Sequence, residues 1–171
     1  MKIGNKIPLT YFIVSGKGES NLGIHTGSFD QALKDAGIPN VNLVFYSSIL
    51  PKEAKEVKPK KLKFGSVVES IAAIAHGKKG QRVTAGLIIG EVFEKNKKIG
   101  SLVAEYSGNV NEERVKKELE ARLNEMFRSR FKTKDFKLKK SKMIIKSFVP
   151  KKKFGTVIVA ICFLSYKILK P

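Results

Sequence analysis

The sequence predicts an α+β fold, a layered α/β/β/α sandwich of mainly antiparallel strands with two main helices. Several segments rich in large and β-branched residues have the length of strands and are separated by glycine-containing or charged turns. Two further segments show helical periodicity, and strands do not alternate strictly with helices. With 171 residues, of which 42% are hydrophobic, the chain can form one domain with a core, and we expect that domain to span residues 1–171.

The expected strands have clear boundaries at several points. The first should run into a flexible loop over residues 15–20, which contains two glycines among polar residues. Another must end near Pro51, because proline restricts the residue before it, and this places Ser47 and Ser48 at a strand end. The last is almost entirely apolar and should be buried on both faces. The complete set of expected strands is 8–14, 41–46, 67–75, 83–93, 102–106, 143–149 and 156–168.

The two predicted helices are amphipathic. The first should begin with Ser28 as its N-cap and end at Gly37, a residue suited to the left-handed conformation that terminates helices. Its apolar face comprises Phe29, Ala32, Leu33 and Ala36. The second should cover residues 111–128, with acidic residues near its positive end. Its apolar face comprises Val115, Leu119, Leu123 and Met126 or Phe127.

The net charge of +19 predicts attraction to phosphates or anionic surfaces. Between Lys132 and Lys153 there are ten lysines and only one acidic residue, Asp135, with phenylalanines interleaved. This segment could bind nucleic acid, although a solvated lysine-rich face that has no dedicated partner is the more common arrangement. We therefore keep nucleic-acid binding as an alternative and do not favour it.

Other classes of function are disfavoured. One cysteine and two histidines argue against a metal site, so no metal is expected. The apolar run at residues 154–166 has about 13 residues, fewer than the roughly 20 that a helix needs to cross a bilayer. No secretory signal is recognisable. We expect a cytoplasmic protein that does not bind a membrane.

Two blocks of sequence carry a specific resemblance. The first reads FDQALKDAGI at residues 29–38, followed by NVNLVFYSSILP at residues 40–51, and the second reads LVAEYSG at residues 102–108. Together they closely resemble the pyruvoyl-dependent arginine decarboxylase family, in which a helix of this pattern precedes an Asn-x-Asn-Leu segment and a Ser-Ser pair. A serine pair alone would carry no weight, since such pairs occur in ordinary turns.

The resemblance implies that the chain cleaves itself. The Ser48 hydroxyl would attack the carbonyl of Ser47, converting the amide into an ester, and elimination would leave a residue that hydrolyses to a pyruvoyl group. The products would be a β chain of residues 1–47 and an α chain of residues 48–171 that carries this covalent prosthetic group. Asn42 matches a family asparagine that is thought to help processing. The alternative role of Asn42 is that of an amide at a strand edge, bonded to backbone.

The same resemblance implies decarboxylation of L-arginine to agmatine and CO2, a step of polyamine biosynthesis, through a Schiff base on the pyruvoyl group. Glu105 matches the proton donor of the family, and its apolar neighbours should raise its pKa. Asp30 aligns with the aspartate that meets the guanidinium, where its alternative role is that of a helix N-terminal carboxylate. Leu33, one turn later, should face the same space and pack on the aliphatic stem of the substrate.

Some points stay open. The lysine-rich segment after Pro51 and the high positive charge depart from the family pattern and weaken the assignment of a cationic substrate. The same chemistry on another amino acid, such as histidine or lysine, is therefore an alternative. The resemblance implies a homo-oligomer, a trimer or a dimer of trimers, with the substrate pocket shared between subunits. Glu69, a carboxylate in an apolar strand, has no role in this interpretation.

Overall fold

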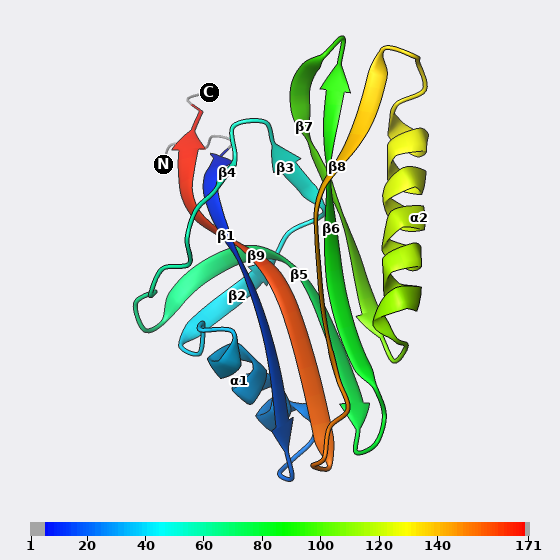
Figure 1. Cartoon of the computed structure of the whole chain (residues 1–171). Coiled ribbons are helices and arrows are strands. Elements are labelled where there is room, and N and C mark those ends of the chain that lie inside the picture. Colours follow the sequence, from blue (N-terminus) through cyan, green and yellow to red (C-terminus); the bar gives the residue numbers. More distant parts are fainter. Residues whose placement is uncertain (1–5, 170–171) are drawn as a thin grey trace.

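The computed structural model describes residues 6–169, and Figure 1 shows two sheets packed face to face with a helix on each outer side. Sheet A has the strand order β2-β5-β9-β1-β4, and sheet B has the order β3-β7-β6-β8. Pairing is antiparallel except for β1 with β4 and β2 with β5. The predicted α/β/β/α sandwich is confirmed. In chain order, the elements are β1 (Lys6–Ser20), α1 (His25–Asp35), β2 (Val41–Phe45), β3 (Ile49–Pro51), β4 (Lys55–Glu56), β5 (Ser66–Lys78), β6 (Val83–Glu94), β7 (Lys97–Gly108), α2 (Glu112–Arg130), β8 (Phe136–Phe148) and β9 (Phe154–Ile168).

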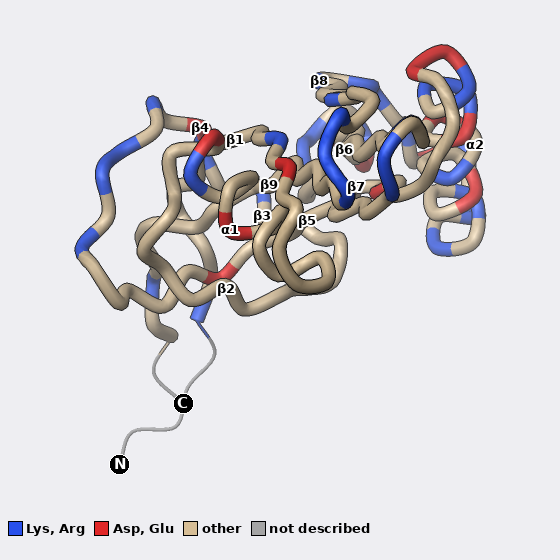
Figure 2. The backbone as a smooth tube through the Cα atoms, turned by 90° about the horizontal axis from the view of Figure 1, so that it is seen from below, with Lys and Arg blue, Asp and Glu red and all other residues tan. Residues whose placement is uncertain are grey.

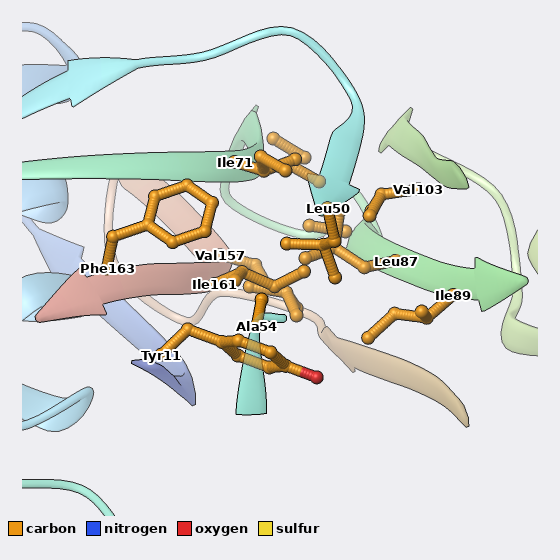
Figure 3. Close-up of a cluster of buried hydrophobic side chains, with 14 of the residues drawn as sticks. Tyr11, Leu50, Ala54, Ile71, Leu87, Ile89, Val103, Val157, Ile161 and Phe163 are labelled. Carbon is orange, nitrogen blue, oxygen red and sulfur yellow. The ribbon is translucent and has the colours of Figure 1, made fainter. Parts of the chain in front are cut away.

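Hydrophobic side chains form three layers of core. The central layer lies between the sheets, and Figure 3 shows side chains of both sheets meeting there, among them Ile71, Val103 and Ile161. Burial of each such side chain contributes about 1.5–3 kcal/mol to folding. The outer layers join α1 to sheet A and α2 to sheet B. Strand β9 occupies the middle of sheet A and sends Ile158 toward α1 and Ile161 into the central layer, which confirms the prediction of burial on both faces.

Helix α2 forms as its periodicity predicts. Asn111 precedes the helix, and its side chain accepts a hydrogen bond from the Arg114 backbone N–H at 2.9 Å, so one of the free N–H groups of the first turn is satisfied. The buried face consists of Val115, Leu119 and Leu123, all fully inaccessible to solvent. The predicted boundaries differ from the observed ones by one or two residues.

Helix α1 corrects one prediction and confirms another. It begins at His25, so Ser28 lies inside the helix and is not its N-cap. The Ser28 hydroxyl is buried, donates to the His25 carbonyl at 2.9 Å and shares a hydrogen bond with the Thr156 hydroxyl at 2.7 Å. Ser28 therefore joins the helix to β9. Gly37 adopts a φ of 76° just after the helix, as predicted for the terminating residue.

The prediction of a flexible loop over residues 15–20 is wrong, because β1 continues to Ser20. The glycines of this segment allow close packing of α1 on the strand. A Cβ atom on Gly16 would lie 2.0 Å from the Ala32 carbonyl oxygen, and one on Gly18 would lie 2.3 Å from the Ala32 nitrogen. Glycine in a strand often marks such an approach of one backbone to another.

Strand β8 begins at Phe136, earlier than the predicted start at residue 143. Its first four residues alternate a half-buried apolar side chain with an exposed lysine, and the lysines that follow mask the strand pattern. Lysine on an edge strand also discourages pairing with other chains, which is a structural reason for part of the basic segment. Figure 2 shows Lys and Arg along the chain in both halves of the molecule, so these residues are not confined to the basic segment.

We expect Gly18→Ala to lower the free energy of unfolding by about 1–3 kcal/mol, because the added methyl group must push α1 away from β1. Urea denaturation would measure the change. Lys17→Ala is the control, since this neighbouring side chain is exposed and should cost less than about 0.5 kcal/mol. Equal effects of the two substitutions would contradict the close-packing explanation.

Candidate active site

Ser47 and Ser48 lie where the chain passes from one sheet to the other. Strand β2 is the edge of sheet A and pairs with β5, whereas β3 is the edge of sheet B and pairs with β7. The serine pair is the connection between them, after Phe45 and Tyr46 and before Ile49. The predicted position at a strand end is confirmed.

Both ends of this crossing are anchored by backbone hydrogen bonds. The Tyr46 N–H donates to the Ser70 carbonyl of sheet A at 2.7 Å, and the Ser48 carbonyl accepts from the Val103 N–H of sheet B at 2.9 Å. Two residues later, Leu50 points into the central core beside Val103, as Figure 3 shows. Ser47 is thus the one residue between two points that the packed sheets hold in place.

Ser48 is the central residue of a tight turn. The Ile49 N–H donates to the Ser47 carbonyl oxygen at 2.8 Å, a hydrogen bond from residue i+2 to residue i that defines a γ-turn. The Ser47 carbonyl belongs to the peptide bond that joins Ser47 to Ser48. A backbone donor is therefore already directed at the oxygen that would become negatively charged if a nucleophile attacked this carbonyl.

The Ser48 hydroxyl meets a carboxylate from the neighbouring strand. It donates to the two carboxylate oxygens of Glu105, with oxygen-to-oxygen distances of 2.8 and 2.9 Å. Glu105 lies on β7 two residues after Val103, so strand alternation directs both side chains to the same side of sheet B. Residues separated by 57 positions in sequence are brought together in this way.

The environment of Glu105 raises its pKa. Burial is the main cause, while the hydrogen bond from Ser48 and the charge of Arg122 act in the opposite direction. The shift agrees with the expectation from its apolar neighbours. Arg122 of α2 donates to the Glu105 carbonyl oxygen at 3.0 Å and lies 5.2 Å from the centre of the Tyr106 ring. The sequence indicated no role for this arginine, because only the packing of α2 on sheet B brings it to β7.

A pocket of about 550 Å³ opens between α1, β2 and β5. Its lining includes Leu33 and Asn42, two of the residues predicted to belong to the site, and a pair of histidines that the sequence analysis missed. The rings of His25 and His76 are tilted by 33° relative to one another, with their centres 4.7 Å apart. Burial, together with the charge of His25, lowers the pKa of His76. Their spacing of 51 positions in sequence offers no local signal of this contact.

The remaining predicted residues lie apart from Ser48. The Asn42 amide donates to the Gly65 carbonyl at 3.3 Å, which is the alternative role of an amide at a strand edge. Asp30 is exposed on α1 and accepts a hydrogen bond from Gln31 at 3.4 Å. Leu33 lines the pocket, whereas Asp30 is not among its lining residues, so the expectation that both face the same space stays a prediction.

Comparison with known proteins agrees with the resemblance in sequence. A family described as pyruvoyl-dependent arginine decarboxylase matches residues 10–168. The chain belongs to this family. Its relatives include the pyruvoyl-dependent arginine decarboxylase of Methanococcus aeolicus, 35% identical over 79% of this chain and 78% of the relative. The enzyme of the same name from Methanocaldococcus jannaschii is 34% identical over 78% of this chain and 76% of the relative. That of Thermococcus sibiricus is 32% identical over 89% of this chain and 91% of the relative.

As a member of the pyruvoyl-dependent arginine decarboxylase family, the chain has the enzyme class expected from its sequence, that of a decarboxylase with a covalent pyruvoyl group. The residues around Ser48 fit the formation of such a group. Its hydroxyl has an acceptor in Glu105, and the carbonyl before it has a donor in the Ile49 N–H. Within residues 6–169, no helix is long and apolar enough to span a membrane, and no cluster of potential metal ligands occurs.

The raised pKa of Glu105 makes a testable prediction about stability. A carboxyl group with a raised pKa stabilises the fold below its unfolded pKa, and that contribution is lost as the pH rises through its folded pKa. In a Ser48→Ala chain, which removes the opposing hydrogen bond, adding Glu105→Gln should therefore raise the melting temperature more as the pH rises above about 4.3, the pKa of an unfolded glutamate. Glu125→Gln makes the same change of charge at an exposed site of α2 and serves as control. A difference that does not vary with pH would contradict the burial of Glu105.

Proposed function

We propose that this chain is the self-processing precursor of a decarboxylase that converts L-arginine to agmatine and CO2 with a pyruvoyl group made from Ser48. One observation carries the proposal. The Ser48 hydroxyl donates to Glu105 at 2.8 and 2.9 Å while the adjacent Ser47 carbonyl accepts from the Ile49 N–H at 2.8 Å. A nucleophile, a base and an oxyanion donor thus converge on one peptide bond. The family membership of the chain supports the same conclusion.

In the first step, the Glu105 carboxylate takes the proton of the Ser48 hydroxyl. The Ser48 oxygen attacks the Ser47 carbonyl carbon, and the negative charge that develops on the Ser47 oxygen is stabilised by the Ile49 N–H. The bond from that carbon to the Ser48 nitrogen then breaks, and the nitrogen takes up a proton. An ester joins the two halves of the chain in place of the amide.

In the second step, loss of the Cα proton of residue 48 breaks the bond between its Cβ atom and the ester oxygen. Ser47 leaves as a carboxylate at the new C-terminus, and water replaces the nitrogen of residue 48, which departs as ammonia. The products are a β chain of residues 1–47 and an α chain of residues 48–171 within one domain. The hydrogen bond from Val103 to the residue 48 carbonyl does not require the Ser47–Ser48 bond, so it can hold the new terminus beside Glu105.

The pyruvoyl group supplies a sink for the electrons that are released when the substrate loses its carboxylate. Glu105 then gives a proton to the substrate carbon. Its raised pKa suits this role, because a buried carboxyl group keeps a proton at a higher pH than an exposed one does. Val103 fixes the position of residue 48, and Arg122 holds the backbone of Glu105.

Substrate recognition requires a second subunit. Ser48 immediately precedes β3, and Asp30 belongs to α1. Figure 1 shows β3 in the upper half of the molecule and α1 toward the lower end. We propose that Asp30 of one subunit binds the guanidinium of a substrate held at Ser48 of another, with Leu33 packing on its aliphatic stem and Asn42 assisting processing. The apolar residues that flank the serine pair support a subunit contact there, since Val44, Phe45 and Ile49 are 44%, 56% and 47% exposed. The proposed assembly is a trimer or a dimer of trimers.

Intact-mass spectrometry of the purified protein tests the self-cleavage. Because Ser48 attacks its own preceding carbonyl, we expect two polypeptides whose masses correspond to residues 1–47 and to residues 48–171 with a pyruvoyl terminus. Ser48→Ala should give one whole chain. A wild-type chain that stays whole on incubation and keeps an ordinary serine at position 48 would overturn the proposed function.

Substrate identity is tested at Asp30. Asp30→Ala should lower kcat/KM for arginine by about 10- to 100-fold, since a charge-assisted hydrogen bond contributes about 1.5–3 kcal/mol, while the extent of self-cleavage stays unchanged. Glu125→Ala, which removes a carboxylate from an exposed position of α2, is the matched control. Turnover of histidine and lysine should be measured in parallel, and faster turnover of either by the wild type would assign that substrate in place of arginine.

A further inference from the structure

Glu69 is a carboxylate in an otherwise apolar part of β5 whose role the sequence does not explain. Ile71 and Ala73 point into the core between the sheets. Because alternate residues of a strand face the same side, Glu69 points to that side as well. Its side chain is only 16% exposed. A carboxylate in such a position needs partners, because burying an unpaired charge is costly.

Three side chains from other segments provide those partners. Lys6 of β1 forms an ion pair with Glu69, and its Nζ lies 4.8 Å from the centre of the Tyr166 ring. Tyr46 and Tyr166 lie beside the same carboxylate. Strand β2 pairs Val44 with Glu69, so Tyr46, two residues later, is the diagonal neighbour of Glu69 on the same face. The ring of Tyr166 contacts the same Lys6 ammonium that pairs with Glu69. Burial alone would raise the pKa of Glu69, but Lys6, Tyr166 and Tyr46 together outweigh it and lower that pKa. The carboxylate is therefore held as an anion by a lysine and two phenols.

Tyr46 connects this cluster to the serine pair. It follows β2 directly and stands two residues before Ser48. Its ring packs on Phe163 of β9, with ring centres 5.7 Å apart, and its N–H donates to Ser70, the residue after Glu69. Tyr46 is consequently fixed by its backbone and its ring on sheet A, with Glu69 as its diagonal neighbour, immediately before the chain crosses to sheet B.

We propose that Glu69 is a positioning residue for self-cleavage, which acts by holding Tyr46 and, through it, the Ser47 carbonyl. This inference rests on the proposed function. Attack by the Ser48 oxygen requires the Ser47 carbonyl to face both that oxygen and the Ile49 N–H, and Ser47 can rotate unless the residue before it is fixed. The Val103 hydrogen bond fixes the downstream side of the crossing, and Glu69, the diagonal neighbour of Tyr46 on the same face of sheet A, fixes the upstream side.

The Tyr46 hydroxyl and the Tyr46 ring have different partners, Glu69 and Phe163, and can be varied separately. Tyr46→Phe keeps the ring that packs on Phe163 and removes the contact with Glu69, whereas Glu69→Gln removes the charge from the other end of the same contact. Each should slow cleavage about tenfold, because ordering roughly one freed backbone residue would raise the activation free energy by an amount that corresponds to that factor. The double variant should be no slower than either single variant, because both remove one contact.

The experiment follows cleavage of freshly synthesised full-length chain over time by intact-mass spectrometry. It compares wild type, Glu69→Gln, Tyr46→Phe and the double variant, with a thermal melt of each. Glu120→Gln is the matched control, because Glu120 of α2 pairs with Lys140 of β8 at 3.1 Å and lies outside the anchored crossing. Decarboxylation is also measured per pyruvoyl group, and we expect kcat on that basis to stay within about twofold of wild type.

The outcomes distinguish failure of the positioning role of Glu69 from failure of the proposed self-cleavage. Slow cleavage in both single variants, without further slowing in the double variant and with normal cleavage in Glu120→Gln, supports the positioning role. Wild-type rates in Tyr46→Phe and Glu69→Gln, or slowing that multiplies in the double variant, overturns it while leaving the proposed function intact. A wild-type chain that never cleaves overturns both. If Glu69→Gln fails to fold, Tyr46→Phe alone decides, since it preserves the packing of the ring.

Discussion

The geometry of the candidate site depends on one constraint: the chain crosses from one packed sheet to the other with only one residue, Ser47, between its two anchored neighbours. Tyr46 is hydrogen-bonded to sheet A and Ser48 to sheet B, so the central core that holds the sheets together also fixes the distance that Ser47 must span. The γ-turn closed by Ile49 follows from this short crossing. Stability and reactivity are thus linked, because any loosening of the sheets would also misalign the serine pair.

The same packing sets the chemistry of Glu105. Strand β7 places Val103 in the core and Glu105 beside Ser48, at the end of the same row of side chains. Burial raises the pKa of Glu105, while burial of Glu69 is compensated by Lys6 and two phenols, so its pKa falls. The pKa values of these two carboxylates near the crossing are therefore shifted in opposite directions. In the proposed function, one moves protons and the other serves as a fixed anion.

A single chain holds the proposed site in two separate parts. Ser48 and Glu105 lie at the crossing, whereas Leu33 and Asn42 line the pocket beside α1 and Asp30 lies exposed on that helix. The apolar residues that flank the serine pair are open to solvent, which agrees with the proposed subunit contact. The lysine-rich β8 lies at the other edge of sheet B, where its charges protect an open strand and have ion-pair partners in α2 and β4.

Sequence alone determined what depends on local pattern: the layered fold class, the α2 helix with its buried face, the doubly buried β9 and, by resemblance, the family. Tertiary structure decided what depends on partners distant in sequence. The glycines of β1 looked like a loop because the helix that packs on them lies further along the chain, and Ser28 looked like a cap because its partner Thr156 lies on β9. The contacts of Glu105 and Glu69 likewise arise from the register and stacking of the strands. Periodicity within a segment predicts which face is buried, but it carries no information on which side chain of another element lies opposite.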